Sequence, residues 1–254
     1  MKKRKAGIGI FVIVLIITAV RVKSMDSHRI SGRILAENIA GPGMMRLVEQ
    51  SMQAQAQKTS VTEIAVKEWK HPQAALTFDD GPDIRYTPLL LDGLKERNVR
   101  ASFFLLGEKV EQYPELVERM QKEGHLVGNH TYHHVQLNKL NETKAREEIL
   151  KTNNLIYETT GVYPLYLRPP FGAWKKNLEL CVEMLPVFWT IDTLDWKVQN
   201  TEKIVHTVQE QIEDGAIILM HDEYDTSVEA ALQVADDLKA QGYELVTVDQ
   251  LILP

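Results

Sequence analysis

The chain has 254 residues, of which 44% are hydrophobic and 25% are charged, so it can bury one substantial core and is expected to be globular. Its net charge of −6 argues against nucleic acid as the main partner, because such binding depends on basic patches that neutralise phosphates. The single cysteine, Cys181, excludes an intramolecular disulfide and a multi-thiolate metal site, so any metal must be held by His, Asp or Glu.

Four basic residues, 2–5, precede an uninterrupted hydrophobic run over residues 6–20. This layout, within residues 1–24, is that of a signal anchor or a secretory signal peptide. We favour an uncleaved, single-pass anchor, because no small-residue cleavage pattern precedes Arg21 and flanking basic side chains can lengthen a short span. The excess of basic residues before the run predicts that the rest of the chain lies outside the cell. If the signal is cleaved, the protein is secreted.

Residues 25–70 are rich in Gln, Ser, Lys and Met and show no strand pattern, so we interpret them as a stem or linker. From residue 71 to residue 254, short hydrophobic runs alternate with longer amphipathic ones, which is typical of β/α units around a parallel sheet. The expected strands are 74–78, 101–105, 126–129, 166–168, 187–191, 216–220 and 245–248. Seven such strands are compatible with an α/β barrel, in which functional residues follow the strands.

Two polar clusters follow expected strands. Asp79 and Asp80 enter a Gly-Pro turn after the first strand, which taken alone could equally be an Asp-rich turn. His130 and His134 follow the third strand and are four residues apart, so they can share one face toward a metal; the alternative is a solvated His cluster. Asp80 with the two imidazoles makes a His-His-Asp set that can hold Zn²⁺ and leave positions open for water and substrate.

Residues 77–82 (TFDDGP) and 130–134 (HTYHH) resemble the first two motifs of the polysaccharide deacetylase, or NodB-homology, family, carbohydrate esterase family four. Three further segments resemble the remaining motifs in family order: 168–172 (RPPFG), 192–196 (DTLDW) and 219–222 (LMHD). The resemblance spans about residues 74–251, and each motif falls at an expected strand end. It implies a distorted (β/α) barrel with about seven parallel strands over residues 71–254.

The resemblance also implies roles around the metal. Asp80, His130 and His134 correspond to the ligands of a divalent metal, for which we expect zinc, with cobalt or manganese as alternatives. Asp79 corresponds to the general base that takes a proton from the attacking water. Arg168 is implied to hold Asp79 ionised through a bidentate contact; the alternative is a structural arginine at the barrel rim.

The remaining motifs imply an acid and a substrate site. His221 corresponds to the general acid, and Asp195 to the partner that orients it and raises its pKa, unless Asp195 is a turn residue. The backbone N–H of Phe171 is implied to stabilise the oxyanion, although the family usually has tyrosine there, so this departure bears on the substrate and not on the reaction. Trp196 is assigned to the substrate groove, with a core residue as the alternative.

The resemblance implies metal-dependent hydrolysis of N-acetyl groups from an amino-sugar polysaccharide. The expected external location makes peptidoglycan the nearest polymer, with a chitin-like polymer as the alternative. The motifs do not separate this activity from that of an O-acetyl polysaccharide esterase. A non-catalytic glycan-binding module is disfavoured because every ligand, base and acid position is filled, and a structural metal is ranked last because structural zinc usually has four protein ligands. The motifs indicate no oligomeric state.

Overall fold

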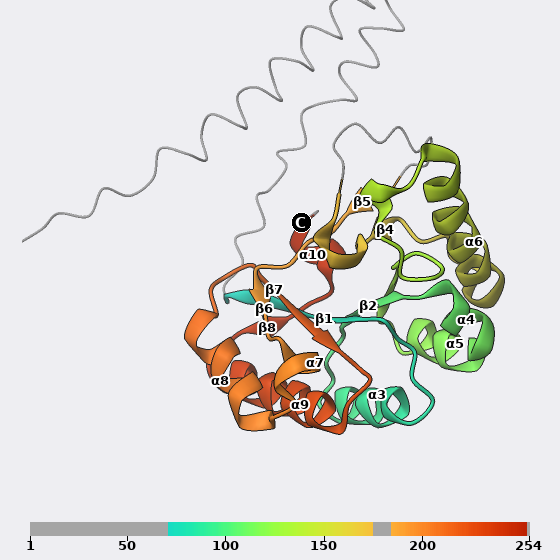
Figure 1. Ribbon diagram of the computed structural model, residues 1–254. Coiled ribbons are helices and arrows are strands. Elements are labelled where there is room, and N and C mark those ends of the chain that lie inside the picture. The colour runs from blue at the N-terminus through green and yellow to red at the C-terminus, as the bar shows by residue number, and fades with distance from the viewer. Residues whose placement is uncertain (1–70, 175–183, 253–254) are drawn as a thin grey trace, which may run out of the picture. The chain divides into compact units, whose positions relative to one another are not determined.

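A computed structural model describes residues 71–174 and 184–252, and both the expected anchor (1–24) and the expected stem (25–70) lie outside these residues. The described residues form one sheet, in which every strand pairing is parallel, with helices packed around it (Figure 1). The strands are β1 (Gln73–Asp79), β2 (Ser102–Leu105), β3 (Leu126–Asn129), β4 (Tyr166–Leu167), β5 (Leu185–Pro186), β6 (Ile191–Asp192), β7 (Ala216–His221) and β8 (Glu244–Leu245).

The strand order is β5-β4-β3-β2-β1-β7-β6, with β8 paired to the start of β1. The sheet curls into a half-barrel, which confirms the distorted (β/α) barrel predicted from the sequence. Within the described residues its edges β5 and β6 are not paired with each other, so the barrel is open there. All residues of the central strands β1 and β2 are buried, as expected for strands covered on both faces.

The helices are α3 (Tyr86–Glu96), α4 (Gly107–Gln112), α5 (Pro114–Lys122), α6 (Glu142–Thr160), α7 (Asp195–Val198), α8 (Thr201–Gln211), α9 (Asp225–Ala240) and α10 (Val248–Ile252), with 3-10 turns η1 (Leu137–Lys139) and η2 (Pro170–Gly172). Helix α6 begins where the Asn141 side chain accepts the N–H of Lys144, and it ends at Gly161, whose φ of 74° suits glycine. None of the helices in 71–174 and 184–252 is long and apolar enough to cross a membrane.

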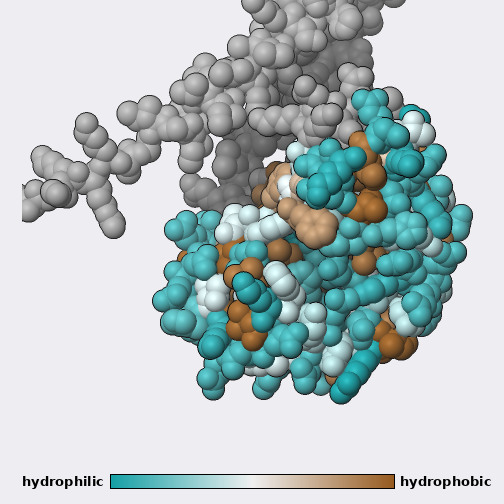
Figure 2. All heavy atoms as spheres, viewed as in Figure 1, coloured by the Kyte–Doolittle hydropathy of each residue, from teal (hydrophilic) through white to brown (hydrophobic). Residues whose placement is uncertain are grey.

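Two hydrophobic clusters lie on the two faces of the sheet. The larger one joins the central strands to α3 and α9, through residues such as Leu90 and Val234. The smaller one contains Ala75, Phe104 and Val248, which belong to β1, β2 and α10. The molecular surface seen in Figure 2 is mostly hydrophilic, with hydrophobic residues gathered in small separate groups. The sheet is therefore held by burial on both faces, which leaves its strand ends available for polar loops.

Two of the expected strands are wrong. Residues 187–191 do not form one strand; β5 and β6 are separate strands on opposite edges of the sheet, and the chain between them crosses its open side. This crossing is visible in its hydrogen bonds, since Val187 N–H donates to Leu167 of β4 whereas Thr190 N–H donates to Ile217 of β7. The hydrophobicity of this run reflects Val187 in the smaller cluster, so it signalled burial and not strand pairing.

The second error is the expected strand 245–248, because β8 ends at Leu245 and α10 begins at Val248. The backbone N–H of Thr247 donates to the side-chain oxygen of Gln250, an arrangement typical of a capping box. The spacing T-x-x-Q over residues 247–250 is a helix-start signal that the hydrophobic pattern obscured.

Candidate active site

The predicted site residues converge at the carboxyl ends of four strands. Asp79 ends β1 and His221 ends β7, while His130 and Arg168 directly follow β3 and β4. Register pairs Asp79 with His221, so these two side chains begin at the same level of the sheet. Because all the strands are parallel, their carboxyl ends meet at one edge and bring together motifs that lie far apart in the chain.

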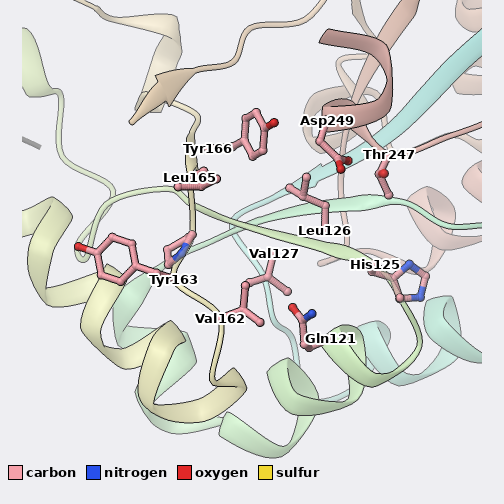
Figure 3. A pocket seen from close by; sticks show the side chains of 12 residues that line it. Gln121, His125, Leu126, Val127, Val162, Tyr163, Leu165, Tyr166, Thr247 and Asp249 are labelled. Carbon is pink, nitrogen blue, oxygen red and sulfur yellow. The ribbon is translucent and has the colours of Figure 1, made fainter. Parts of the chain in front are cut away.

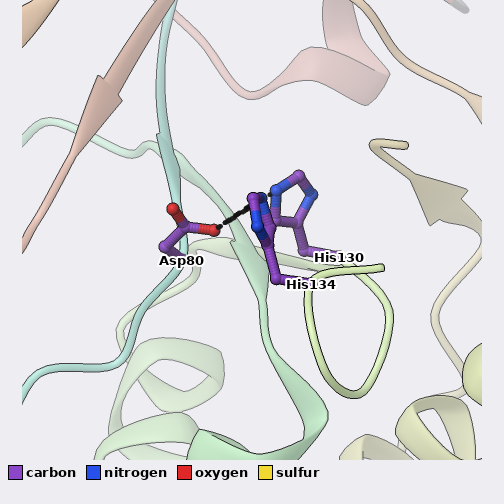
Figure 4. Close-up of side chains that lie close together, drawn as sticks. All are labelled: Asp80, His130 and His134. Atoms are coloured by element: carbon purple, nitrogen blue, oxygen red, sulfur yellow. Dashed lines mark ion pairs between the residues drawn. The ribbon is translucent and has the colours of Figure 1, made fainter. Parts of the chain in front are cut away.

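Asp80, His130 and His134 form a compact group (Figure 4). Asp80 Oδ1 lies 3.3 Å from Nε2 of His130 and 3.4 Å from Nε2 of His134. One ligand atom from each residue lies within 4.8 Å of the others. The predicted ligand set is therefore brought together by the fold.

The hydrogen bonding of this group fits a metal ion. His130 Nδ1 lies 2.6 Å from the backbone oxygen of Arg168, which can only accept, so the proton is on Nδ1 and the Nε2 lone pair faces Asp80. Asp80 Oδ1 is buried and receives no hydrogen bond from the described residues. Buried acceptors that face one another are unfavourable unless a cation satisfies them. Two imidazoles and one carboxylate suit a divalent metal such as zinc.

The charge state of Asp80 supports this interpretation. Burial by itself would raise its pKa, but the neighbouring imidazoles of His130, His134 and His221 outweigh burial and lower the pKa to about 2. Burial lowers the pKa of His134, against the attraction of Asp80. An ionised carboxylate is the form that binds a metal, and a lowered pKa favours the neutral imidazole of His134 that a metal requires.

Asp79 is held by a buried arginine. The Arg168 side chain is fully buried, and its Nη1 donates to Asp79 Oδ1 at 2.8 Å and to Thr77 Oγ1 at 2.7 Å. The guanidinium also stacks 4.2 Å from the ring centroid of Phe104. The predicted ion pair between Arg168 and Asp79 is confirmed. The expected bidentate contact is wrong, because only Nη1 reaches Asp79. The hydrogen bond to Thr77 and the stacking on Phe104 orient the guanidinium instead.

His221 and Asp195 form a second buried pair. His221 Nδ1 lies 2.8 Å from Asp195 Oδ1, and the backbone N–H of His221 donates to Asp195 Oδ2 at 2.7 Å. Burial lowers the pKa of His221, but the hydrogen bond and charge of Asp195, with Asp79 and Asp80, outweigh it and raise the pKa to about 9. His221 Nε2 lies 3.9 Å from Asp80 Oδ2 and so faces the ligand group. Asp195 is thus a fully buried partner of His221 and not a solvated turn residue.

The two expected substrate-site aromatics are exposed. Phe171 is 68% exposed, and its ring centroid lies 4.6 Å from that of His134. Trp196, next to Asp195 in α7, is 49% exposed, which excludes the alternative that it is a core residue. Both aromatic surfaces are therefore available for contact with a ligand beside the polar group.

The loops of this site are held in a strained backbone conformation. Among the described residues, seven that are not glycine have positive φ, and five of them belong to the site loops: Asp80 (68°), Thr131 (69°), His134 (54°), Phe171 (60°) and Leu194 (52°). Such conformations cost roughly 1–3 kcal/mol each and persist only where surrounding contacts enforce them. Their concentration in the site loops indicates that contacts within the site, and not the backbone preferences of the individual residues, fix the conformation of these loops.

Asp222 is a structural part of the site for which the sequence pattern predicted no role. Its side chain is fully buried, and it accepts a hydrogen bond from the Thr87 hydroxyl and packs against Gly81, where no larger side chain would fit. Burial raises the pKa of Asp222 to about 7, against the hydrogen bond of Thr87 and the charge of Lys109. The signal for Asp222 in the sequence was a carboxylate directly after a hydrophobic strand. It was not used because the role predicted for segment 219–222 was assigned to His221 alone.

A pocket of about 240 Å³ lies elsewhere, at the starts of β3 and β4 (Figure 3). Its lining includes His125, Tyr166 and Asp249 but none of the predicted site residues. Burial lowers the pKa of His125 to about 4, so this histidine is neutral and its Nδ1 accepts the backbone N–H of Ala101. The pocket is thus distinct from the polar group at the carboxyl ends of the strands.

Comparison with known proteins gives a consistent result. Residues 67–188 match the polysaccharide deacetylase family. The chain is 44% identical over 177 residues to the peptidoglycan-N-acetylglucosamine deacetylase PgdA of Listeria monocytogenes, covering 70% of this chain and 38% of PgdA. It is 40% identical over 186 residues to a peptidoglycan-N-acetylglucosamine deacetylase of Bacillus cereus, covering 70% of this chain and 68% of that protein.

Among solved structures, peptidoglycan deacetylase PdaC from Bacillus subtilis is similar with a TM-score of 0.70 and 42% sequence identity, covering 72% of this chain and 91% of the PdaC structure. The structural match thus extends over most of the described residues. The chain spans only 38% of the length of PgdA, so the similarity concerns only part of that relative.

Proposed function

Since this chain belongs to the polysaccharide deacetylase family, as its five motifs predict, we propose that it is a metal-dependent enzyme that removes N-acetyl groups from peptidoglycan. The observation that carries the proposal is the meeting of a His-His-Asp group with two buried pairs, Asp79–Arg168 and His221–Asp195. The three relatives described above are named for peptidoglycan, which favours this polymer over a chitin-like one.

Asp80, His130 and His134 would hold the metal, for which we propose zinc. A divalent metal bound there supplies a Lewis acid that polarises the acetyl oxygen and makes water more acidic. The preference for zinc is based on the borderline-soft imidazole ligands; cobalt and manganese are the alternatives to be compared in reconstitution.

Asp79 would act as the general base. Its Oδ1 accepts a hydrogen bond from Arg168, and this ion pair fixes the orientation of the carboxylate. Its Oδ2 lies 3.7 Å from His130 Nε2 and therefore faces the ligand group, where the attacking water must lie. As water attacks the acetyl carbon, Asp79 accepts one of its protons, which is typical of carboxylate bases in hydrolysis.

His221 would act as the general acid. Asp195 holds its Nδ1–H, so Nε2 is the atom that can give a proton to the leaving nitrogen. When the C–N bond breaks, the sugar amine leaves with that proton and the acetyl group leaves as acetate. The backbone N–H of Phe171 is proposed to stabilise the charge on the acetyl oxygen, and Trp196 to line the substrate groove.

The proposed location follows from the substrate and from the N-terminal sequence. Peptidoglycan lies outside the cell membrane, and residues 1–24 have the charge and hydrophobicity of a signal anchor. We therefore propose that residues 25–70 form a stem between this anchor and an external catalytic domain at residues 71–254.

The test is acetate release by the detergent-solubilised full chain from purified peptidoglycan, chitin oligomers and O-acetylated xylan. We expect release from peptidoglycan that stops after chelation and returns with Zn²⁺, with Co²⁺ and Mn²⁺ compared in parallel. Release from O-acetylated xylan alone would identify an esterase instead. Protein that binds metal but releases no acetate from any of these polymers would refute the proposed activity.

A further inference from the structure

The loop that carries the two metal-binding histidines is tied to α6 by one carboxylate. Glu148 Oε2 accepts the backbone N–H of Tyr132 at 3.0 Å and that of His133 at 2.9 Å. Its Oε1 lies 2.8 Å from His133 Nδ1. A single side chain thus holds two consecutive backbone amides and one ring of the segment between His130 and His134.

Helix α4 holds the opposite edge of the same loop. The backbone oxygens of Thr131 and Tyr132 accept the N–H groups of Gly107 and Glu108 at 2.9 Å and 3.2 Å. These donors belong to the first turn of α4, where N–H groups have no partner within the helix. A methyl group at Gly107 would overlap the Tyr132 ring and the Thr152 hydroxyl, so glycine permits this close approach. The amides of the loop therefore face α6, and its carbonyls face α4.

The conformation of the loop explains why such restraint is needed. Thr131 and His134 have φ values of 69° and 54°, which residues with a side chain rarely adopt. The amide of Thr131 is held separately, because it donates to Asn129 Oδ1 at 2.6 Å. Without the contacts to Glu148, the amides of Tyr132 and His133 would lose their restraint, so that the segment between these two strained residues could relax and His134 could shift relative to Asp80.

We propose that Glu148 is a positioning residue of the metal centre, which sets the separation of His130 and His134 through the backbone between them. Glu148 itself contacts neither ligand, so it acts through the loop. The inference rests on the proposed function, because it concerns the same metal site. Groups that orient metal ligands typically affect metal affinity by about 10–100-fold when they are removed.

The experiment compares Glu148→Ala with Glu147→Ala in the full chain. Glu147 is the next residue of α6, is exposed, and makes no hydrogen bond or ion pair within the described part of the chain, so it is a matched control. Three quantities are measured: the Zn²⁺ dissociation constant by chelator competition, the visible absorption spectrum of bound Co²⁺, and the melting temperature without metal. We expect Glu148→Ala to weaken Zn²⁺ binding by about 10–100-fold and to change the Co²⁺ spectrum, with Glu147→Ala unchanged.

A conservative variant separates positioning from general stability. The amide oxygen of Glu148→Gln can still accept both backbone N–H groups, so this variant should recover most of the Zn²⁺ affinity. Glu148→Asp withdraws the carboxylate by one methylene and should weaken binding several-fold, which provides a second readout if the alanine variant does not fold. A lower metal-free melting temperature with unchanged Zn²⁺ affinity and Co²⁺ spectrum in the alanine and aspartate variants would overturn the proposal. Acetate release by the unaltered chain, measured separately, tests the proposed activity without bearing on this comparison.

Discussion

Asp79 and Asp80 are adjacent in the chain, yet their carboxylates have different partners. Asp79 Oδ1 receives Arg168, whereas Asp80 Oδ1 faces the two histidines. The strand ends between them, and Asp80 has a φ of 68°, so consecutive side chains are not constrained to the alternation of a regular strand. One carboxylate is thereby left for proton transfer while the other is left for a metal.

This division predicts different outcomes for two substitutions. Asp79→Asn should lower kcat by about 10²–10⁴-fold, the usual contribution of a general base, while the protein still binds one equivalent of Zn²⁺. His134→Ala should lose both turnover and Zn²⁺, because it removes a ligand. Acetate release and metal content after dialysis check both variants. Equal metal loss in the two would contradict the division of roles.

The contact between His221 and Asp195 leads to a second prediction. The pKa of His221 is raised to about 9 from the ordinary 6.5, because Asp195 outweighs the opposing effect of burial. A raised pKa in the folded state means that protonation of His221 stabilises the fold fully below about pH 6.5 and that this contribution is lost as the pH rises through about 9.

Asp195→Asn keeps the shape of the partner but removes its charge, so the pKa of His221 should fall. We expect the alkaline limb of the kcat/KM profile to move to lower pH in this variant. The decrease in melting temperature between pH 6.5 and 9 should also be smaller than in the unaltered protein, since less protonation is lost. An alkaline limb that does not move would show that Asp195 does not control the acid.

The residue types of the motifs predicted most of the site, and the residues that they missed share a physical feature. All seven predicted ionisable residues come together at the carboxyl ends of the strands. Glu148 was not predicted because a glutamate in an amphipathic helix resembles an ordinary solvated residue. Its contacts to residues 132 and 133, which lie 16 and 15 positions earlier in the chain, exist only once α6 has packed beside the loop.

At the scale of elements, the packing of α4 against the histidine loop depends on a glycine. Gly107→Ala places a methyl group against Tyr132 and Thr152 and should force the helix and the loop apart. We expect a loss of about 1–3 kcal/mol in the free energy of unfolding, the usual cost of overpacking. Urea denaturation of the metal-free protein measures this loss, and Glu108→Ala, exposed in the same helical turn, is the control. An equal free energy of unfolding in the two variants would show that the loop can move to accommodate the methyl group without loss of stability.

The errors in the predicted elements also have a common cause. The expected strand over residues 187–191 was a hydrophobic run that crosses the open side of the sheet, and the expected strand over residues 245–248 contained the start of a helix. In both cases the hydrophobic residues indicated burial. A strand forms only where another extended segment lies beside it and pairs with its backbone. That neighbour is supplied by residues far away in sequence, so a local pattern does not contain it.

For the molecule as a whole, the proposed anchor in residues 1–24 leads to a prediction about where the enzyme acts. With residues 1–24 as an uncleaved anchor, the full chain should remain in the membrane fraction after carbonate extraction, and external protease should digest its catalytic domain on intact cells whose wall has been removed. Deletion of residues 1–24 from a cytosolically expressed chain should leave acetate release from soluble peptidoglycan fragments unchanged. A mature protein whose N-terminus begins after residue 20 would identify a cleaved signal instead.

Strand pattern and motif spacing were sufficient to predict the family, the parallel β/α architecture and the Asp80, His130 and His134 group, because these signals are local and parallel strands bring their carboxyl ends to one edge. The way in which these residues are held became clear only from the folded structure. Three features depend on partners from other elements of the fold. Arg168 contacts Asp79 through one nitrogen, Asp195 is buried against His221, and Glu148 and α4 bind the backbone of the histidine loop. Such contacts form between surfaces that only packing brings together, so their geometry is a property of the fold and not of any one segment.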